Sequence, residues 1–168
     1  MKRLIEIKTA LSMRLDVRAV AAAPPGFEVR EVPRAELEAT LGGTVLARAP
    51  AELDVTAPHG WRAFVAFADG APVHVTFVER RPGRPLTFGG LTDPQARGRG
   101  AKRATVAFVA ARLREEGESR LFSSVDAANL PSIRAQTAAG FVVERRTVDV
   151  RVLGVSLRGL ARRLLGHR

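Results

Sequence analysis

A short loop rich in glycine and basic residues is the part of the sequence that most clearly predicts chemistry. Residues 97–102 read Arg-Gly-Arg-Gly-Ala-Lys, and they separate an apolar run from a stretch with helical periodicity. Glycines let successive backbone N–H groups point into one concavity, and the N-terminus of a helix adds partial positive charge. The loop therefore predicts a site for phosphate groups, with an ordinary solvated helix start as the alternative interpretation.

Several other chemistries are excluded by what the chain lacks. It contains no cysteine, so disulfides, thiolate metal ligands and cysteine nucleophiles are ruled out. The three histidines, His59, His74 and His167, have no metal-binding spacing, and we expect no metal site. The loop matches neither the Walker A pattern nor the glycine fingerprint of dinucleotide-binding folds.

The balance of charge points to anionic ligands. The chain of 168 residues has a formal net charge of +10, although lysine occurs only at Lys2, Lys8 and Lys102. Such a field attracts CoA, an acyl carrier protein or RNA. Nucleic acid is not an expected partner, because aromatic residues are few and no nucleic-acid motif is present. No apolar run has the length of a membrane span, and charges interrupt the N-terminal segment, so we expect a cytoplasmic protein that is not integral to a membrane.

The segment before the loop is predicted to consist mainly of strands. Residues 27–32 alternate between apolar and polar side chains, which is typical of a strand, and residues 33–41 read as a helix. Asp69-Gly70 separates two strand-like runs and predicts a hairpin, because its turn needs positive φ angles. A third strand is expected over residues 86–91, where two adjacent glycines indicate a bulge or a close approach to the backbone.

Helices and strands alternate after the loop. Val106, Val109 and Leu113 share one face of a helix that Gly117 is expected to end. The remaining elements are expected as a strand over residues 121–125, a helix over 132–139 with Asn129 as its N-cap, and a strand region over 141–153 with a break near 145–146 as one interpretation. This order predicts a mixed α/β sheet.

The sequence predicts the secondary structure less clearly at the two ends of the chain than in its middle. The first 20 residues fit either an alternating strand or a helix with an apolar stripe, and residues 21–26 read as a linker with two prolines. Residues 44–60 carry weak signals, for which a second short helix is one interpretation. We divide the chain into an N-terminal extension and linker (1–26), a compact domain (27–155) and a basic amphipathic C-terminal helix (156–168).

Two motifs in the expected order resemble those of the GNAT (N-acetyltransferase) superfamily. That family has a strand, a bend with proline, the pattern [QR]-x-x-G-x-[GA] and a long helix. Here Asp93-Pro94 precedes Arg97-x-x-Gly100-x-Lys102, and a strand, Asn129, a helix and a Gly-Phe pair follow. Gln95-x-x-Gly98-x-Gly100 also matches the pattern. We prefer the alignment that begins at Arg97, because it places the later elements at family-like positions without a gap. The resemblance covers about residues 61–150, with a looser match from residue 27.

The resemblance implies a fold and an activity. The fold would be a GNAT-like α/β (α+β) structure with a mixed, mostly antiparallel central sheet flanked by helices and a splayed parallel strand pair at the cofactor site. The activity would be transfer of an acyl group from acetyl-CoA or a related acyl-CoA to an amine acceptor by direct attack. The alternative is a catalytically weak or inactive module of this fold that binds CoA, an acyl carrier protein or another anionic partner, and a homodimer is possible in either case. The residues expected at the cofactor are Leu91, Thr92, Arg97, Gly98, Arg99, Gly100, Ala101, Lys102 and Asn129.

The sequence is less clear about which residues would act as general base and general acid. His74 and Glu79 are the candidate bases, although a partly exposed strand residue is the favoured interpretation of His74 and an ion pair with a nearby arginine that of Glu79. Asp93 is a third candidate that could equally hold the turn before Pro94. Many family members place a tyrosine as general acid where this chain has Gln136, and the chain has no tyrosine.

Overall fold

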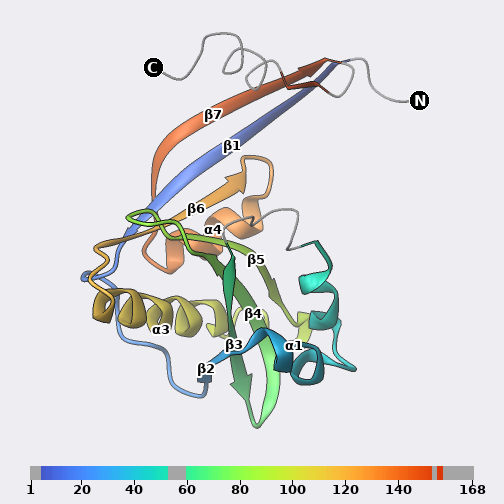
Figure 1. Cartoon of the computed structure of the whole chain (residues 1–168), viewed down its shortest axis with the longest axis vertical. Coiled ribbons are helices and arrows are strands. Elements are labelled where there is room, and N and C mark those ends of the chain that lie inside the picture. The colour runs from blue at the N-terminus through green and yellow to red at the C-terminus, as the bar shows by residue number, and fades with distance from the viewer. Residues whose placement is uncertain (1–4, 53–59, 153–154, 157–168) are drawn as a thin grey trace.

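One eight-stranded sheet runs through the molecule (Figure 1). The computed structural model describes residues 5–52, 60–152 and 155–156. The strand order is β2-β3-β4-β5-β6-β1-β7-β8, and the described strands pair in antiparallel fashion except β5 and β6, which are parallel. The elements are β1 (Ile5–Asp16), β2 (Glu28–Val32), α1 (Arg34–Leu41), the 3-10 helix η1 (Val45–Glu52), β3 (Trp61–Ala68), β4 (Ala71–Glu79), β5 (Leu86–Thr92), the 3-10 helix η2 (Pro94–Ala96), α3 (Ala101–Glu115), β6 (Arg120–Asp126), α4 (Leu130–Ala138), β7 (Val142–Val152) and β8 (Val155–Ser156).

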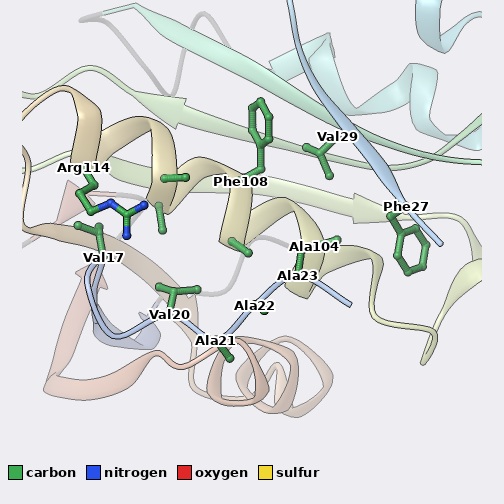
Figure 2. A pocket seen from close by; sticks show the side chains of 13 residues that line it. Val17, Val20, Ala21, Ala22, Ala23, Phe27, Val29, Ala104, Phe108 and Arg114 are labelled. Carbon is green, nitrogen blue, oxygen red and sulfur yellow. The ribbon is translucent and has the colours of Figure 1, made fainter. Parts of the chain in front are cut away.

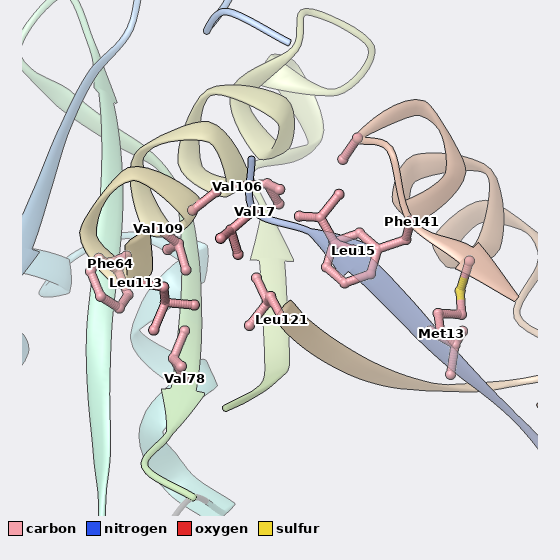
Figure 3. Close-up of a cluster of buried hydrophobic side chains, with 13 residues drawn as sticks. Met13, Leu15, Val17, Phe64, Val78, Val106, Val109, Leu113, Leu121 and Phe141 are labelled. Carbon is pink, nitrogen blue, oxygen red and sulfur yellow. The ribbon is translucent and has the colours of Figure 1, made fainter. Parts of the chain in front are cut away.

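Helices cover both faces of the sheet, and each face has its own apolar cluster. On one face α3 packs Val106, Val109 and Leu113 against side chains such as Phe64 of β3 and Leu121 of β6 (Figure 3). On the other face α1 and η1 cover a cluster formed with alternate residues of β3 and β4. Because β3 and β4 are covered on both sides, their sequences read as nearly continuous apolar runs.

The local turns and caps lie where the sequence predicts them. Asp69 and Gly70 join β3 to β4 with φ angles of 51° and 77°, as the expected hairpin turn requires. The expected bulge at the paired glycines is present in β5, since Phe77 pairs with Phe88 and Val75 with Leu91. Asn129 caps α4, and its side-chain oxygen accepts a hydrogen bond from the N–H of Ser132 at 3.1 Å.

The N-terminal segment differs from its predicted role as an extension outside the domain. Residues 5–16 form β1, which lies between β6 and β7 inside the sheet, and the strand interpretation of this segment is therefore correct. Met13, Leu15 and Val17 belong to the apolar cluster under α3. The signal at this end was ambiguous because a strand of this kind depends on partners much later in the chain, such as Val125 and Arg146.

β7, which lies between β1 and β8 in the sheet, is one long strand. β7 is continuous over Val142–Val152, and the interruption expected near residue 145 is a bulge at Glu144, since Met13 pairs with Val143 and Ser12 with Arg145. The predicted C-terminal helix (156–168) lies outside the described residues except for Ser156, which is in β8. Within the described ranges, no helix is both long and apolar enough to cross a membrane.

Candidate functional site

The loop before α3 has the geometry of an anion site. Gly98 and Gly100 have φ angles of 76° and 101°, in the region that favours glycine, and Gly100 is the N-cap of α3. Ala101 is the first residue of the helix and Lys102 the second. The positive end of a 15-residue helix therefore begins at this loop. Within the loop, the N–H groups of Arg97 and Arg99 donate to Pro94 O and Ala96 O at 3.5 Å each. Arg97, Arg99 and Arg103 are exposed around it.

The parallel strands β5 and β6 separate next to this loop. They are paired at Leu86–Phe122 and Thr87–Ser123, and the described pairing goes no further. The bulge at Gly89 and Gly90 follows immediately on β5. A Cβ added at Gly90 would lie 3.5 Å from Thr76 Oγ1 and 3.8 Å from His74 Cε1, so the bulge brings the β5 backbone close to β4. The result is a cleft between two neighbouring strands.

Two adjoining cavities occupy the cleft. The larger, of about 580 Å³, is lined by the glycine loop, by the end of β5 at residues 90–92 and by α4. The smaller, of about 210 Å³, lies between β5 and β6 where the strands diverge. Gly90, Lys102, Asn129 and Ser132 line both. The structure therefore brings together the predicted cofactor residues Leu91, Thr92, Arg97, Gly98, Gly100, Ala101, Lys102 and Asn129 at the cavities, whereas Arg99 does not line either one.

The smaller cavity is lined by hydroxyl and amide groups, of which the sequence analysis singled out only Asn129 and Gln136. Thr76 and Thr87 hydrogen-bond through their hydroxyls at 3.0 Å. Ser123 Oγ accepts a hydrogen bond from Gln136 Nε2 at 2.7 Å. The signal for these residues in the sequence is a Thr or Ser inside a buried, otherwise apolar strand, as at Thr76 between Val75 and Phe77. We call this cavity the hydroxyl pocket.

His74 lies in the cleft, but its environment differs from the sequence prediction. The expected partly exposed side chain is buried, because β4 is covered on both faces. His74 Nδ1 lies 2.7 Å from Thr92 Oγ1, whereas its buried Nε2 has no hydrogen-bond partner among the described residues. Burial, and secondly the positive charge of Lys102, lower the pKa of His74 to about 3. The imidazole is therefore neutral and weakly basic near neutral pH.

The other two candidate bases are engaged in structural contacts. Glu79 is fully buried at the far end of β4, where its Oε2 pairs with Arg81 Nη2 at 2.7 Å, and it lines neither cavity of the cleft. The predicted ion pair with a nearby arginine is thus present. Asp93 Oδ1 accepts a hydrogen bond from the N–H of Gln95 at 2.8 Å and so holds the turn at Pro94.

Lys102 places an ammonium group inside the cleft. Its side chain is half-buried and lines both cavities. Burial lowers the pKa of Lys102 to about 8, because the charged form loses hydration. Among the described residues it has no ion-pair partner. Gln136, at the position where the family resemblance implies a tyrosine, is buried in the lining of the smaller cavity, and its Oε1 has no hydrogen-bond partner among the described residues.

A third cavity lies on the other side of α3 and has a different character (Figure 2). The linker at residues 20–23 passes along α3 and encloses about 330 Å³ with Ala104, Phe108 and other mostly apolar side chains. Arg114 is the charged residue in its lining. With so few polar groups, this cavity offers little chemistry, and the cleft between β5 and β6 is the candidate site.

The comparisons with known proteins identify the fold. No protein-family model matches the sequence, and no curated protein sequence matches it significantly. A putative acetyltransferase of the GNAT family from Novosphingobium aromaticivorans is similar in structure with a TM-score of 0.61, 20% identity and coverage of 88% of this chain and 65% of the other. A GCN5-related N-acetyltransferase from Kribbella flavida gives a TM-score of 0.67 at 18% identity, covering 92% and 62%. The chain has the GNAT fold.

A third solved structure is similar over a shorter part of this chain. It is AAC(6′)-Iy in complex with the bisubstrate analogue CoA-S-monomethyl-acetylneamine, with a TM-score of 0.52, 21% identity and coverage of 71% of this chain and 93% of that protein. By contrast, this chain spans just under two thirds of the lengths of the Novosphingobium and Kribbella proteins. All three identities are low, so the similarity is one of fold.

Proposed function

We propose that this protein is an acyl-CoA-dependent N-acyltransferase, and in the simplest case an N-acetyltransferase. The observation that carries the proposal is the cleft that opens after the Thr87–Ser123 pair and leads to the glycine loop at the start of α3. A thioester of CoA has an anionic end and a long, narrow arm. A cleft with an anion site at its mouth and a polar interior matches both features.

Each part of the cleft fits a part of CoA. The N–H groups of the loop and the start of α3 would hold the diphosphate, with Arg97 and Arg103 nearby. The gap between β5 and β6 would take the pantetheine arm, which carries amide N–H groups. The unpartnered Oε1 of Gln136 is a buried acceptor for such a donor, and burying it without one is costly.

The end of β5 has a backbone group suited to polarise a carbonyl. The N–H of Asp93 donates to Val73 O on β4 at 2.9 Å. Successive N–H groups of a strand point to opposite edges, so the N–H of Thr92 points away from β4 and toward the cleft. Bound there, the thioester would supply an activated acyl carbonyl, and the N–H of Thr92 would stabilise negative charge on its oxygen. His74, with a pKa of about 3, would act as a neutral wall of the site rather than as the base.

A second candidate function is a module that binds CoA or an acyl carrier protein without turnover. It is favoured by Gln136, whose amide cannot protonate a leaving thiolate as a tyrosine hydroxyl could, and by Lys102, whose side chain partly fills the cleft. Thiolates are good leaving groups and can be protonated by water. Gln136 and Lys102 therefore do not exclude the acyltransferase.

Two measurements on the same protein separate these functions. A ligand that binds only the folded state raises the melting temperature, and both functions predict an increase with acetyl-CoA. Release of free CoA thiol from acetyl-CoA in the presence of a panel of amines is expected only of the transferase. Binding without thiol release would support the module, whereas no rise in melting temperature with saturating acetyl-CoA would reject both.

Matched arginine variants test where the ligand binds. Arg97→Gln and Arg103→Gln each remove a charge beside the loop, and each is expected to weaken acetyl-CoA binding by about three- to tenfold, the effect of roughly 1 kcal/mol. Arg120→Gln is the control, since Arg120 is exposed at the other end of β6 and lines neither cavity of the cleft. An equal loss in all three variants would point to a general effect of net charge instead.

A further inference from the structure

The linker between β1 and β2 runs along α3 from one end of that helix to the other. Where the linker begins, the N–H of Val17 donates to Ser119 O at 3.2 Å, just beyond the end of α3. Where it ends, a Cβ added at Gly100, the N-cap of α3, would lie 3.9 Å from Phe27 Cε2. The apolar cavity on this side of α3 is therefore elongated, with the helix as one wall and the linker as the other (Figure 2).

The dimensions of the cavity suit a long and narrow ligand. Its lining on α3 extends from Ala104 to Arg114, and a rise of 1.5 Å per residue gives a length of about 15 Å. Ala107 and Ala111 leave space along the helix because their side chains are small. The volume of about 330 Å³ is within the range of about 300–1,000 Å³ that is typical of small-molecule sites.

The cavity is charged at one end only. Arg114 lies beside Val17 at that end, whereas Phe27 and Ala104 lie at the other (Figure 2). Apart from Arg114, every lining residue is Ala, Val or Phe, so the side chains offer water in the cavity few hydrogen bonds. Arg114 is exposed, and among the described residues no carboxylate forms an ion pair with it. An apolar chain with an anionic head matches this distribution of charge.

We propose that this cavity binds a straight-chain carboxylic acid, with its carboxylate at Arg114 and its chain directed along α3 toward Phe27. A zigzag of C–C bonds of about 1.5 Å advances about 1.25 Å per carbon, so a length of about 15 Å takes a chain of about 10–12 carbons. Arginine binds carboxylates through charge-assisted hydrogen bonds, and its exposed position lets the head group stay partly hydrated. The site goes beyond the proposed function, because none of its described lining residues lines either cavity of the cleft.

Titration calorimetry of the full chain with decanoate, hexanoate and decanol tests the proposal. Each CH₂ group that becomes buried tightens binding about fourfold, so decanoate is expected to bind at least about tenfold more tightly than hexanoate. Arg114→Gln is expected to weaken decanoate binding about three- to tenfold and to leave decanol binding within about twofold of the wild type. Arg134→Gln is the matched control, because it removes an equal charge from an exposed position on α4 that does not line the cavity.

A larger side chain in the wall of the cavity tests the position of the chain. Ala107→Leu is expected to abolish binding of both decanoate and decanol while the circular dichroism spectrum of the wild type is kept. If that variant is less stable than the wild type, Ala111→Leu fills the same cavity from the next turn of α3. Decanoate that does not bind, binds no better than hexanoate, or binds equally well to the leucine variant would overturn the proposal. An equal loss of decanoate binding in Arg114→Gln and Arg134→Gln would also overturn it, since net charge alone would then attract the anion.

Discussion

At the scale of single residues, the cleft is defined by basic groups held in a poorly hydrated environment. His74 and Lys102 both have lowered pKa values, because burial disfavours the charged form of each. The sequence identified both residues but not their environment. The alternation around His74 predicted a side chain on one face of a strand, and it could not reveal that helices cover both faces of β4.

The buried His74 makes the protein sensitive to acid. Its pKa is about 3 when folded and about 6.5 when unfolded, so the unfolded chain binds the proton first as the pH falls, and stability is lost between about pH 6.5 and 3. Between pH 7 and 5 this group is expected to remove about 2 kcal/mol from the free energy of unfolding. His74→Leu lacks this contribution, and urea denaturation of both proteins at the two pH values measures it.

The test compares the loss of unfolding free energy from pH 7 to pH 5 in the wild type with the same loss in His74→Leu. His74→Leu also loses the contact with Thr92, but it loses that contact at both pH values, and the offset cancels. The stability of the variant is therefore expected to fall about 2 kcal/mol less than that of the wild type from pH 7 to pH 5. Equal losses in the two proteins would mean that His74 titrates normally and is not buried as the structure has it.

At the scale of elements, prediction succeeded where the signal is local. The Asp69-Gly70 turn, the Asn129 cap and the bulge at Gly89 and Gly90 each depend on a few neighbouring residues, and all are present. The position of β1 depends instead on pairing with β6 and β7, which follow it by more than a hundred residues. No local pattern carries that information, so the sequence of this segment is compatible with either a strand or a helix.

The structure predicts that β1 is essential to the domain. Met13 is fully buried between β6 and β7 on the side of α3. Met13→Ala is expected to lower the free energy of unfolding by about 2–5 kcal/mol, because it removes buried apolar area and leaves a cavity. Val148→Ala on β7 is the control, since half of that side chain is exposed, and its effect is expected to be below about 1 kcal/mol. Similar small effects in both variants, measured by chemical denaturation, would contradict the interior position of β1.

At the scale of the whole molecule, the fold explains why the cleft can exist in a continuous sheet. α3 and its apolar cluster hold β1, β3 and β6 from one side, and α1 with η1 holds β3 and β4 from the other (Figures 1 and 3). β5 and β6 can then separate beyond Thr87 and Ser123 without the sheet coming apart. The net charge of +10 over the whole chain favours anionic ligands in general.

A crystal structure of the full chain with CoA tests the central claim most directly. We expect the diphosphate to accept hydrogen bonds from backbone N–H groups within residues 98–103, and the pantetheine arm to lie between β5 and β6 with an amide N–H near Gln136 Oε1. The Lys102 side chain is expected to move to admit the arm. CoA bound elsewhere on the surface, or a cleft that stays closed and empty at saturating CoA, would contradict the assignment of this cleft as the acyl-CoA site.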